Sequence, residues 1–85
     1  MYEKILEGII AYWEKEIDDE EVVVAPESNL MSDLALSSLE MLRSLLVLET
    51  EFGIRIPEKQ LRRMITVADT AQVILEAIEK QKGSK

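Results

Sequence analysis

The sequence predicts an all-α fold, a bundle of three main helices and one short helix with a long loop between the first two. Apolar residues recur at three- and four-residue steps along the first and last stretches of the chain, which gives a helix one buried face. Two Ser/Thr-x-x-acid patterns, which begin at Ser37 and Thr66, match the capping box found where helices start. We expect a single domain over residues 1–81 and a disordered C-terminal tail over residues 82–85.

The first helix is expected over residues 2–17. Its apolar positions share one face, and they are Ile5, Leu6, Ile9, Ile10, Trp13 and Ile17. Four acidic residues follow at 18–21, where the negative end of the helix dipole disfavours them. The helix should therefore end close to Ile17.

Residues 22–36 are expected to form the long loop. They include turn-forming residues without a helical repeat, and apolar anchors are spaced along them: Val24, Leu30, Leu34 and Leu36. The three valines at 22–24 are also compatible with a short strand. No second strand-like run is present for them to pair with, so a loop is the favoured interpretation.

The second helix is the most strongly predicted element. Ser37 is its expected N-cap, and Glu40 stands at the position that completes a capping box. Apolar residues continue to Phe52, and Gly53 is well placed to end the helix in a left-handed conformation. Helix two is therefore expected from about Ser38 to Phe52.

A short helix and a last long helix are expected after it. Pro57 and Glu58 suit the first turn of the short helix, which should carry Leu61 and Met64. The last helix follows the second capping box, and its apolar positions are Val67, Ala71, Ile74, Leu75 and Ile78. Fraying is expected from Lys80 onwards.

The composition disfavours several classes of function. The formal charge of −7 repels nucleic acids and anionic lipid surfaces. The chain contains neither cysteine nor histidine, so a disulfide, a thiolate-zinc site and a Ser-His or Cys-His nucleophile pair are all excluded. A metal protein or an enzyme would depend on the acidic run at 18–21, which is more simply a solvated segment. We therefore expect a protein that is not an enzyme.

The start of the chain leads directly into an amphipathic pattern, and no apolar run reaches membrane-spanning length. We therefore expect a cytoplasmic protein that does not insert into membranes. An acidic surface of this kind suits a protein partner with a basic patch, although many acidic proteins are simply soluble.

One short stretch carries a concentrated chemical signal. Residues 33–42 read Asp-Leu-Ala-Leu-Ser-Ser-Leu-Glu-Met-Leu and resemble the phosphopantetheine attachment motif of acyl carrier proteins. A Ser-x-x-Glu pattern alone would indicate only a helix cap. The resemblance continues over residues 52–57 and at Thr66. The spacings of these segments from Ser38 match the family's layout. In total the resemblance covers about the last two-thirds of the chain.

The resemblance implies an acyl-carrier-like bundle with 4′-phosphopantetheine attached covalently to Ser38 by a separate phosphopantetheinyl transferase. The arm's thiol would hold acyl or aminoacyl groups as thioesters for loading and acyl-transfer enzymes, and the protein is expected to be a monomer. Because Ser38 would be the first residue of helix two, a phosphodiester on its hydroxyl would lie near free backbone N–H groups and the positive end of the helix dipole.

The chain departs from the family at the residue before Ser38, where the family usually has Asp and this chain has Ser37. Serine replaces aspartate well as an N-cap, but a carboxylate used by the transferase is missing unless Asp33 or Glu40 compensates. An alternative function is therefore an interaction module that keeps the carrier fold but is not phosphopantetheinylated.

Helix two also carries the expected partner surface. A spacing of about 100° per residue groups an outward face of Glu40, Arg43, Ser44, Val47, Thr50 and Glu51. The residues expected to contact partners are Leu39, Glu40, Arg43 and Val47, with Met41 and Leu46 at the edges and Glu20, Glu21 and Asp33 as weaker candidates. Arg43 places a positive charge where the family is mostly acidic, which is either a partner filter or an incidental surface charge.

Two points stay open from the sequence. Glu49 falls on the expected buried side of helix two, where it either reaches water at the helix end or pairs with a basic residue such as Arg55, Arg62 or Arg63. The aliphatic residues are compatible with a pocket that shelters short acyl chains, as in this family, and equally with a filled core. The identity of the cargo is not encoded in any motif.

Overall fold

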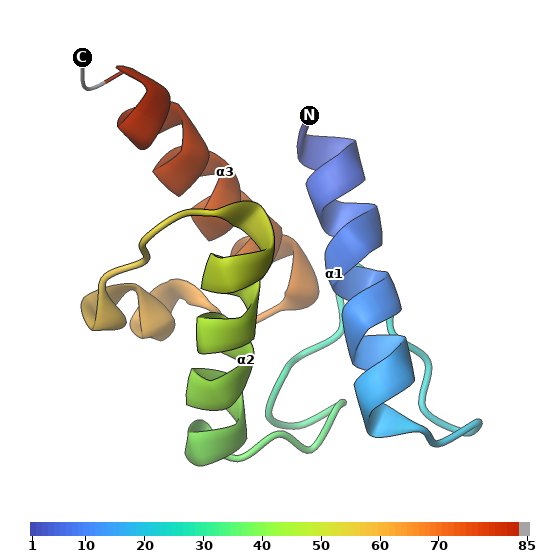
Figure 1. Ribbon diagram of the computed structural model, residues 1–85. Helices are drawn as coiled ribbons and strands as arrows, with labels where there is room; N and C mark the ends of the chain where they lie inside the picture. Colours follow the sequence, from blue (N-terminus) through green and yellow to red (C-terminus); the bar gives the residue numbers. More distant parts are fainter. Residues whose placement is uncertain (84–85) are drawn as a thin grey trace.

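The computed structural model describes residues 1–83, and these form a helical bundle without a β-strand (Figure 1). The elements follow in the order α1 (Tyr2–Ile17), α2 (Ser38–Phe52), the short 3₁₀ helix η1 (Glu58–Arg63) and α3 (Val67–Gly83). The predicted all-α bundle of three main helices and one short helix is confirmed. The valines at 22–24 form no strand, and Asn29 and Thr66 make only an isolated bridge.

The core lies where α1 and α3 pack together, with α2 beside them (Figure 1). From α1 it receives Ile5, Ile9 and Trp13, each at most 3% exposed. The expected anchors of the long loop are also buried, namely Val24, Leu30, Leu34 and Leu36. Removing these side chains from water offsets the entropy lost when the loop is ordered.

Backbone hydrogen bonds fix the middle of the long loop against the start of α3. The N–H of Leu30 donates to the carbonyl of Ile65 at 2.9 Å, and the N–H of Val67 donates to the carbonyl of Ser28 at 3.0 Å. The Ser28 hydroxyl also accepts from the backbone N–H of Ala25 at 2.9 Å. These hydrogen bonds therefore fix the position of the loop that leads into α2.

Local chemistry sets the helix ends as expected. The first helix stops before Asp18, which adopts a left-handed conformation with φ 45°. Gly53 ends α2 with φ 63°, and its N–H donates to the carbonyl of Glu49. At the start of α3, the Thr66 hydroxyl accepts from the N–H of Asp69 at 3.1 Å, and the carboxylate of Asp69 accepts from the N–H of Thr66 at 3.1 Å.

Two boundaries differ from expectation. Met64 is buried but lies just after η1 as its C-cap, because the tighter 3₁₀ turn ends at Arg63. The fraying expected from Lys80 is wrong for residues 80–83, which continue α3. Residues 84 and 85 of the expected tail lie outside the described residues, and the division at residue 81 stays a prediction.

Candidate functional site

Two adjacent serines at the start of α2 have different surroundings. The hydroxyl of Ser37 accepts a hydrogen bond from the N–H of Glu40 at 3.2 Å, and the Glu40 carboxylate accepts from the N–H of Ser37 at 2.9 Å. The predicted capping box is thus complete. Ser38 is exposed, and its hydroxyl bonds to no other group in the part of the chain that the structure describes.

The first turn of α2 offers free backbone donors beside Ser38. The N–H groups of Glu40 and Met41 bond to the side chain and the carbonyl of Ser37, respectively. The N–H groups of Ser38 and Leu39 have no partner among the described residues. Free N–H groups and the positive end of the helix dipole stabilise an anion there. The residues at this position therefore fit a phosphodiester on Ser38.

The capping box stabilises the ionised form of the Glu40 carboxylate. The backbone N–H of Ser37, and next its hydroxyl, lower the pKa of Glu40, and the nearby charge of Arg43 lowers it further. Opposite charges therefore lie side by side on the exposed part of α2. Within residues 1–83, no three acidic side chains come together in an arrangement that could hold a metal ion, those of residues 18–21 included.

Most of the predicted partner residues form one exposed surface. Leu39 is 69% exposed and Val47 is 43% exposed, and both Glu40 and Arg43 are exposed as well. We call these four residues the α2 surface. Leu46, expected at its edge, is also exposed.

Two residues assigned to this surface are in fact buried. Met41, expected at the edge, is only 7% exposed and belongs to the core. Ser44, expected to face outward, is 5% exposed because Trp13 of α1 packs over it and donates a hydrogen bond from its indole Nε1–H to the Ser44 hydroxyl at 3.3 Å. The periodicity of one helix shows which residues share a face. It does not show whether a neighbouring helix covers part of that face.

The weaker partner candidates lie in other segments. Glu20 and Glu21 occupy the exposed turn after α1. The carboxylate of Asp33 accepts from the N–H of Asn29 at 2.7 Å and stabilises the long loop. The structure therefore does not bring Glu20 and Glu21 into the α2 surface, and it gives Asp33 a structural role within the loop.

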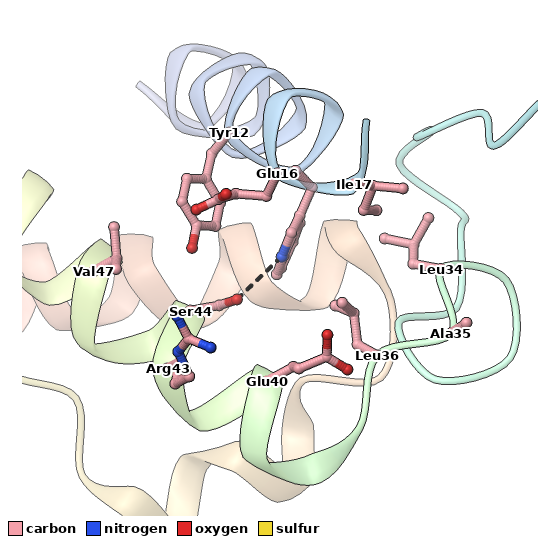
Figure 2. A pocket seen from close by; sticks show the side chains of 11 residues that line it. Tyr12, Glu16, Ile17, Leu34, Ala35, Leu36, Glu40, Arg43, Ser44 and Val47 are labelled. Atoms are coloured by element: carbon pink, nitrogen blue, oxygen red, sulfur yellow. Dashed lines mark hydrogen bonds between the residues drawn. The ribbon is translucent and has the colours of Figure 1, made fainter. Parts of the chain in front are cut away.

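A pocket of about 400 Å³ lies between α1, α2 and the end of the long loop (Figure 2). We call it the α1–α2 pocket. Its lining includes Tyr12, Trp13 and Glu16 from α1, residues 34–36 from the loop, and Glu40, Arg43, Ser44 and Val47 from α2. A pocket was one of the two interpretations left open by the sequence, but its lining residues could not be named, because its walls come from three segments that no single periodic pattern connects.

A second pocket, of about 490 Å³, lies between residues 55–60 and the second half of α3. None of its lining residues belongs to α2 or to the loop that precedes Ser38. Of these two pockets, the α1–α2 pocket borders the candidate attachment site.

Comparison with known proteins identifies the family. A family model described as phosphopantetheine attachment site matches residues 7–74. The chain is 31% identical over 70 residues to the acyl carrier protein of Helicobacter pylori, covering 82% of this chain and 90% of the relative. This chain belongs to the acyl carrier protein family. It is similarly 31% identical over 71 residues to the acyl carrier protein of Thermosynechococcus vestitus, covering 84% and 88% of the two chains.

A more distant acyl carrier protein, from Rickettsia canadensis, is 27% identical over 74 residues and spans 87% of this chain and 86% of the relative. As a member of this family the chain is a carrier rather than an enzyme, and it bears covalently attached 4′-phosphopantetheine. It works with a phosphopantetheinyl transferase and with acyl-handling enzymes. No helix among residues 1–83 is long and apolar enough to cross a membrane.

Proposed function

We propose that Ser38 carries the phosphopantetheine arm and that the chain presents thioester-linked acyl or aminoacyl groups to partner enzymes in the cytoplasm. The observation that carries this proposal is the division of labour between the two serines. The Ser37 hydroxyl is engaged as the N-cap, whereas the Ser38 hydroxyl is exposed beside free N–H groups. During attachment the transferase takes up the Ser38 hydroxyl proton, the Ser38 Oγ–P bond forms as the pyrophosphate bond of coenzyme A breaks, and the nucleotide part leaves with the other phosphate.

The α2 surface supports the proposed presentation of cargo. A partner that reaches Ser38 must approach the N-terminal end of α2, where Leu39 offers an apolar contact and Glu40 and Arg43 offer opposite charges, and Val47 extends the apolar contact further along the helix. Such a mixed surface suits a dedicated enzyme that carries a carboxylate opposite Arg43, because complementary charges favour correct pairs and like charges reject others. Partners of general fatty-acid biosynthesis that rely on a purely basic patch should bind less well.

Intact mass spectrometry after incubation with a phosphopantetheinyl transferase and coenzyme A tests the attachment site. The wild-type chain and Ser37→Ala should gain the mass of one arm, and Ser38→Ala should gain none. Loss of the cap in Ser37→Ala should lower the free energy of unfolding by about 0.5–2 kcal/mol, whereas Ser38→Ala should unfold like the wild type. An arm found on Ser37 would refute the assignment, and an unmodified wild-type chain would favour the alternative of an interaction module without the arm.

A further inference from the structure

We infer that the protein binds a free amphiphilic anion, with one carboxylate or phosphate group on a short apolar body, in the second pocket. We call this the η1–α3 pocket, because its walls are residues 55–60, which run into η1, and residues 73–81 of α3. Figure 1 shows the second half of α3 at the opposite end of the bundle from the start of α2, where Ser38 lies. The ligand is therefore a separate molecule and not the cargo of the arm.

The basic residues of the chain are concentrated around this pocket. Seven of the ten basic residues but only four of the seventeen acidic residues lie in 55–85, so this part carries a formal charge of +3 in a chain of −7. Three of these cations line the pocket, namely Arg55, Lys59 and Lys80. They are exposed, and their side chains have no hydrogen-bond or ion-pair partner among the described residues. An anion in the pocket therefore meets cations whose charge the protein does not neutralise.

Glu76 is the acidic residue of the lining, and its charge is already matched. Its two carboxylate oxygens accept from the two guanidinium nitrogens of Arg63 at 2.6 and 2.8 Å, and the side-chain amide of Gln72 donates to it at 3.1 Å. These bonds lower the pKa of Glu76 to about 2, so the carboxylate stays ionised and paired. The acidic residues nearest to the lining in sequence, Glu58 and Glu79, do not line the pocket. The unmatched charge of the lining is therefore positive.

The inner wall of the pocket is apolar. Ile56 and Val73 are 5% and 3% exposed, and Pro57 and Ala77 extend the apolar wall. The volume of about 490 Å³ lies within the range of small-molecule sites. An inorganic anion would leave this apolar wall in contact with water, whereas an alkyl or aromatic body would cover it. The combination of an apolar wall with unpaired cations thus favours an amphiphile over an inorganic anion.

Two polar contacts fix the walls of the pocket relative to each other. The ion pair of Arg63 and Glu76 joins η1 to α3, and the side-chain amide of Gln81 donates to the carbonyl of Arg55 at 3.1 Å. Residues 76 and 81 are about 7–8 Å apart along the axis of α3, so the walls are joined at two separate points. The contact with Gln81 uses the backbone of Arg55 and leaves its guanidinium available to a ligand. Walls joined in this way favour a compact molecule over an extended peptide.

The test compares ligands that separate the charge from the apolar body. Octanoate and octyl phosphate have both, octanol lacks the charge, and acetate lacks the apolar body. Each is titrated into the wild-type chain with its arm unloaded and into Ser38→Ala, and amide NMR signals are followed. Octanoate should shift the signals of residues 55–60 and 73–81 and bind roughly tenfold more tightly than octanol, because three exposed cations contribute. Acetate should not saturate the site.

The two chains should bind octanoate equally, because the ligand does not use the arm. Saturable binding of either charged amphiphile supports the inference, and the tighter of the two identifies the head group that the pocket prefers.

Matched variants assign the binding to the pocket. Arg55→Gln and Lys80→Gln should each weaken octanoate binding about two- to fivefold, the range for exposed charge pairs. Arg62→Gln removes an exposed cation of η1 outside the lining and should leave the affinity unchanged. Ala77→Leu fills part of the pocket without a change of charge and should weaken binding of octanoate and octanol alike. If Ala77→Leu does not fold, the two charge variants still decide the question.

Three results would overturn the inference: equal affinities for octanoate and octanol, equal affinities in the wild type and in both charge variants, or shifts concentrated on the indole N–H of Trp13 and residues 34–47. The last of these would place the ligand in the α1–α2 pocket instead. None of them bears on attachment at Ser38, which mass spectrometry tests separately.

Discussion

The indole N–H of Trp13 donates a hydrogen bond of 3.3 Å to the hydroxyl of Ser44 and so connects α1 to α2 across 31 positions of the sequence. Both residues are buried, at 1% and 5% exposure. The bond fixes the distance between two helices that border the α1–α2 pocket. It also turns the Ser44 hydroxyl proton away from Trp13.

Replacement of Ser44 by alanine should leave the indole N–H of Trp13 buried without a partner. The expected loss is about 1–3 kcal/mol in the free energy of unfolding, the cost of an unsatisfied buried donor. Urea denaturation of Ser44→Ala, Trp13→Phe and the double variant measures the coupling between them. In the Trp13→Phe background, Ser44→Ala should cost much less, and equal costs in the two backgrounds would show that the bond contributes nothing.

Ser44 also shows where prediction from sequence reached its limit. Helix bounds and caps depend on neighbours within four residues, so Ser37, Gly53 and Thr66 could all be assigned correctly. Burial on α2 depends on where α1 comes to lie, and that is set by contacts distant in sequence. For this reason Ser44 and Met41 were assigned to the exposed surface although both are buried.

Ala35 is a non-glycine residue in a left-handed conformation, with φ 56°, three residues before Ser38. A left-handed backbone conformation costs an L-residue about 1–2 kcal/mol. Glycine avoids this cost, but it has more conformational freedom in the unfolded chain, so the substitution recovers only part of the cost. Ala35→Gly should therefore raise the free energy of unfolding by about 0.5–1 kcal/mol. Ala25, in the same loop, does not have a positive φ, so Ala25→Gly should lower the free energy of unfolding. A loss of stability in Ala35→Gly would contradict this account.

The carboxylate of Glu49 accepts a hydrogen bond of 2.6 Å from the backbone N–H of Ile56 and so binds the segment after α2 to the helix. Of the two expectations for Glu49, the ion pair with Arg55, Arg62 or Arg63 is wrong, because none forms within residues 1–83. The side chain is only partly buried, so it still contacts water as the other expectation has it. A helical wheel shows only how the side chains of one helix are arranged. It does not show a backbone N–H from a segment that follows the helix. This interaction could not be found from the spacing of side chains.

Replacement of Glu49 by alanine should cost about 1–3 kcal/mol in the free energy of unfolding, because the N–H of the buried Ile56 loses its charged acceptor. Glu49→Gln keeps an acceptor oxygen and should cost less. Glu51→Ala is the control, since this exposed residue of the same helix should change stability by less than about 0.5 kcal/mol. Thermal and urea unfolding of the three variants checks this order.

Arg63 and Glu76 form an ion pair between η1 and α3, with distances of 2.6 and 2.8 Å between the two guanidinium nitrogens and the two carboxylate oxygens. Hydrogen bonds from Arg63 and then from Gln72 lower the pKa of Glu76 to about 2 from its ordinary 4.5. A lowered carboxyl pKa gives stability that is present above pH 4.5 and is lost as the pH falls towards 2. The pair is exposed, so this contribution is small.

An NMR titration of the Glu76 carboxyl group measures the effect directly. The wild-type midpoint should lie at about 2, and Arg63→Gln should raise it towards 4.5 because the main cause of the shift is gone. Arg62→Gln removes a neighbouring exposed charge outside the ion pair and should leave the midpoint unchanged. Similar titrations in the wild type and in Arg63→Gln would show that the ion pair does not persist in solution.

Arg43 gives the α2 surface a positive charge about one turn beyond Ser38, where a partner enzyme approaches the arm. Arg43→Glu should speed transfer to a generic fatty-acid synthase enzyme with a basic docking patch and slow transfer to the enzyme encoded beside this gene. Surface pairs contribute about 0.2–1 kcal/mol each, so we expect rate changes of about two- to fivefold in each direction. Both changes should shrink at higher salt, because screening weakens exposed charge pairs. Butyryl cargo is used throughout, so that the two enzymes are compared with the same acyl group. If the wild type and Arg43→Glu have the same transfer rates with both enzymes at low salt, the charge of Arg43 does not contribute to docking.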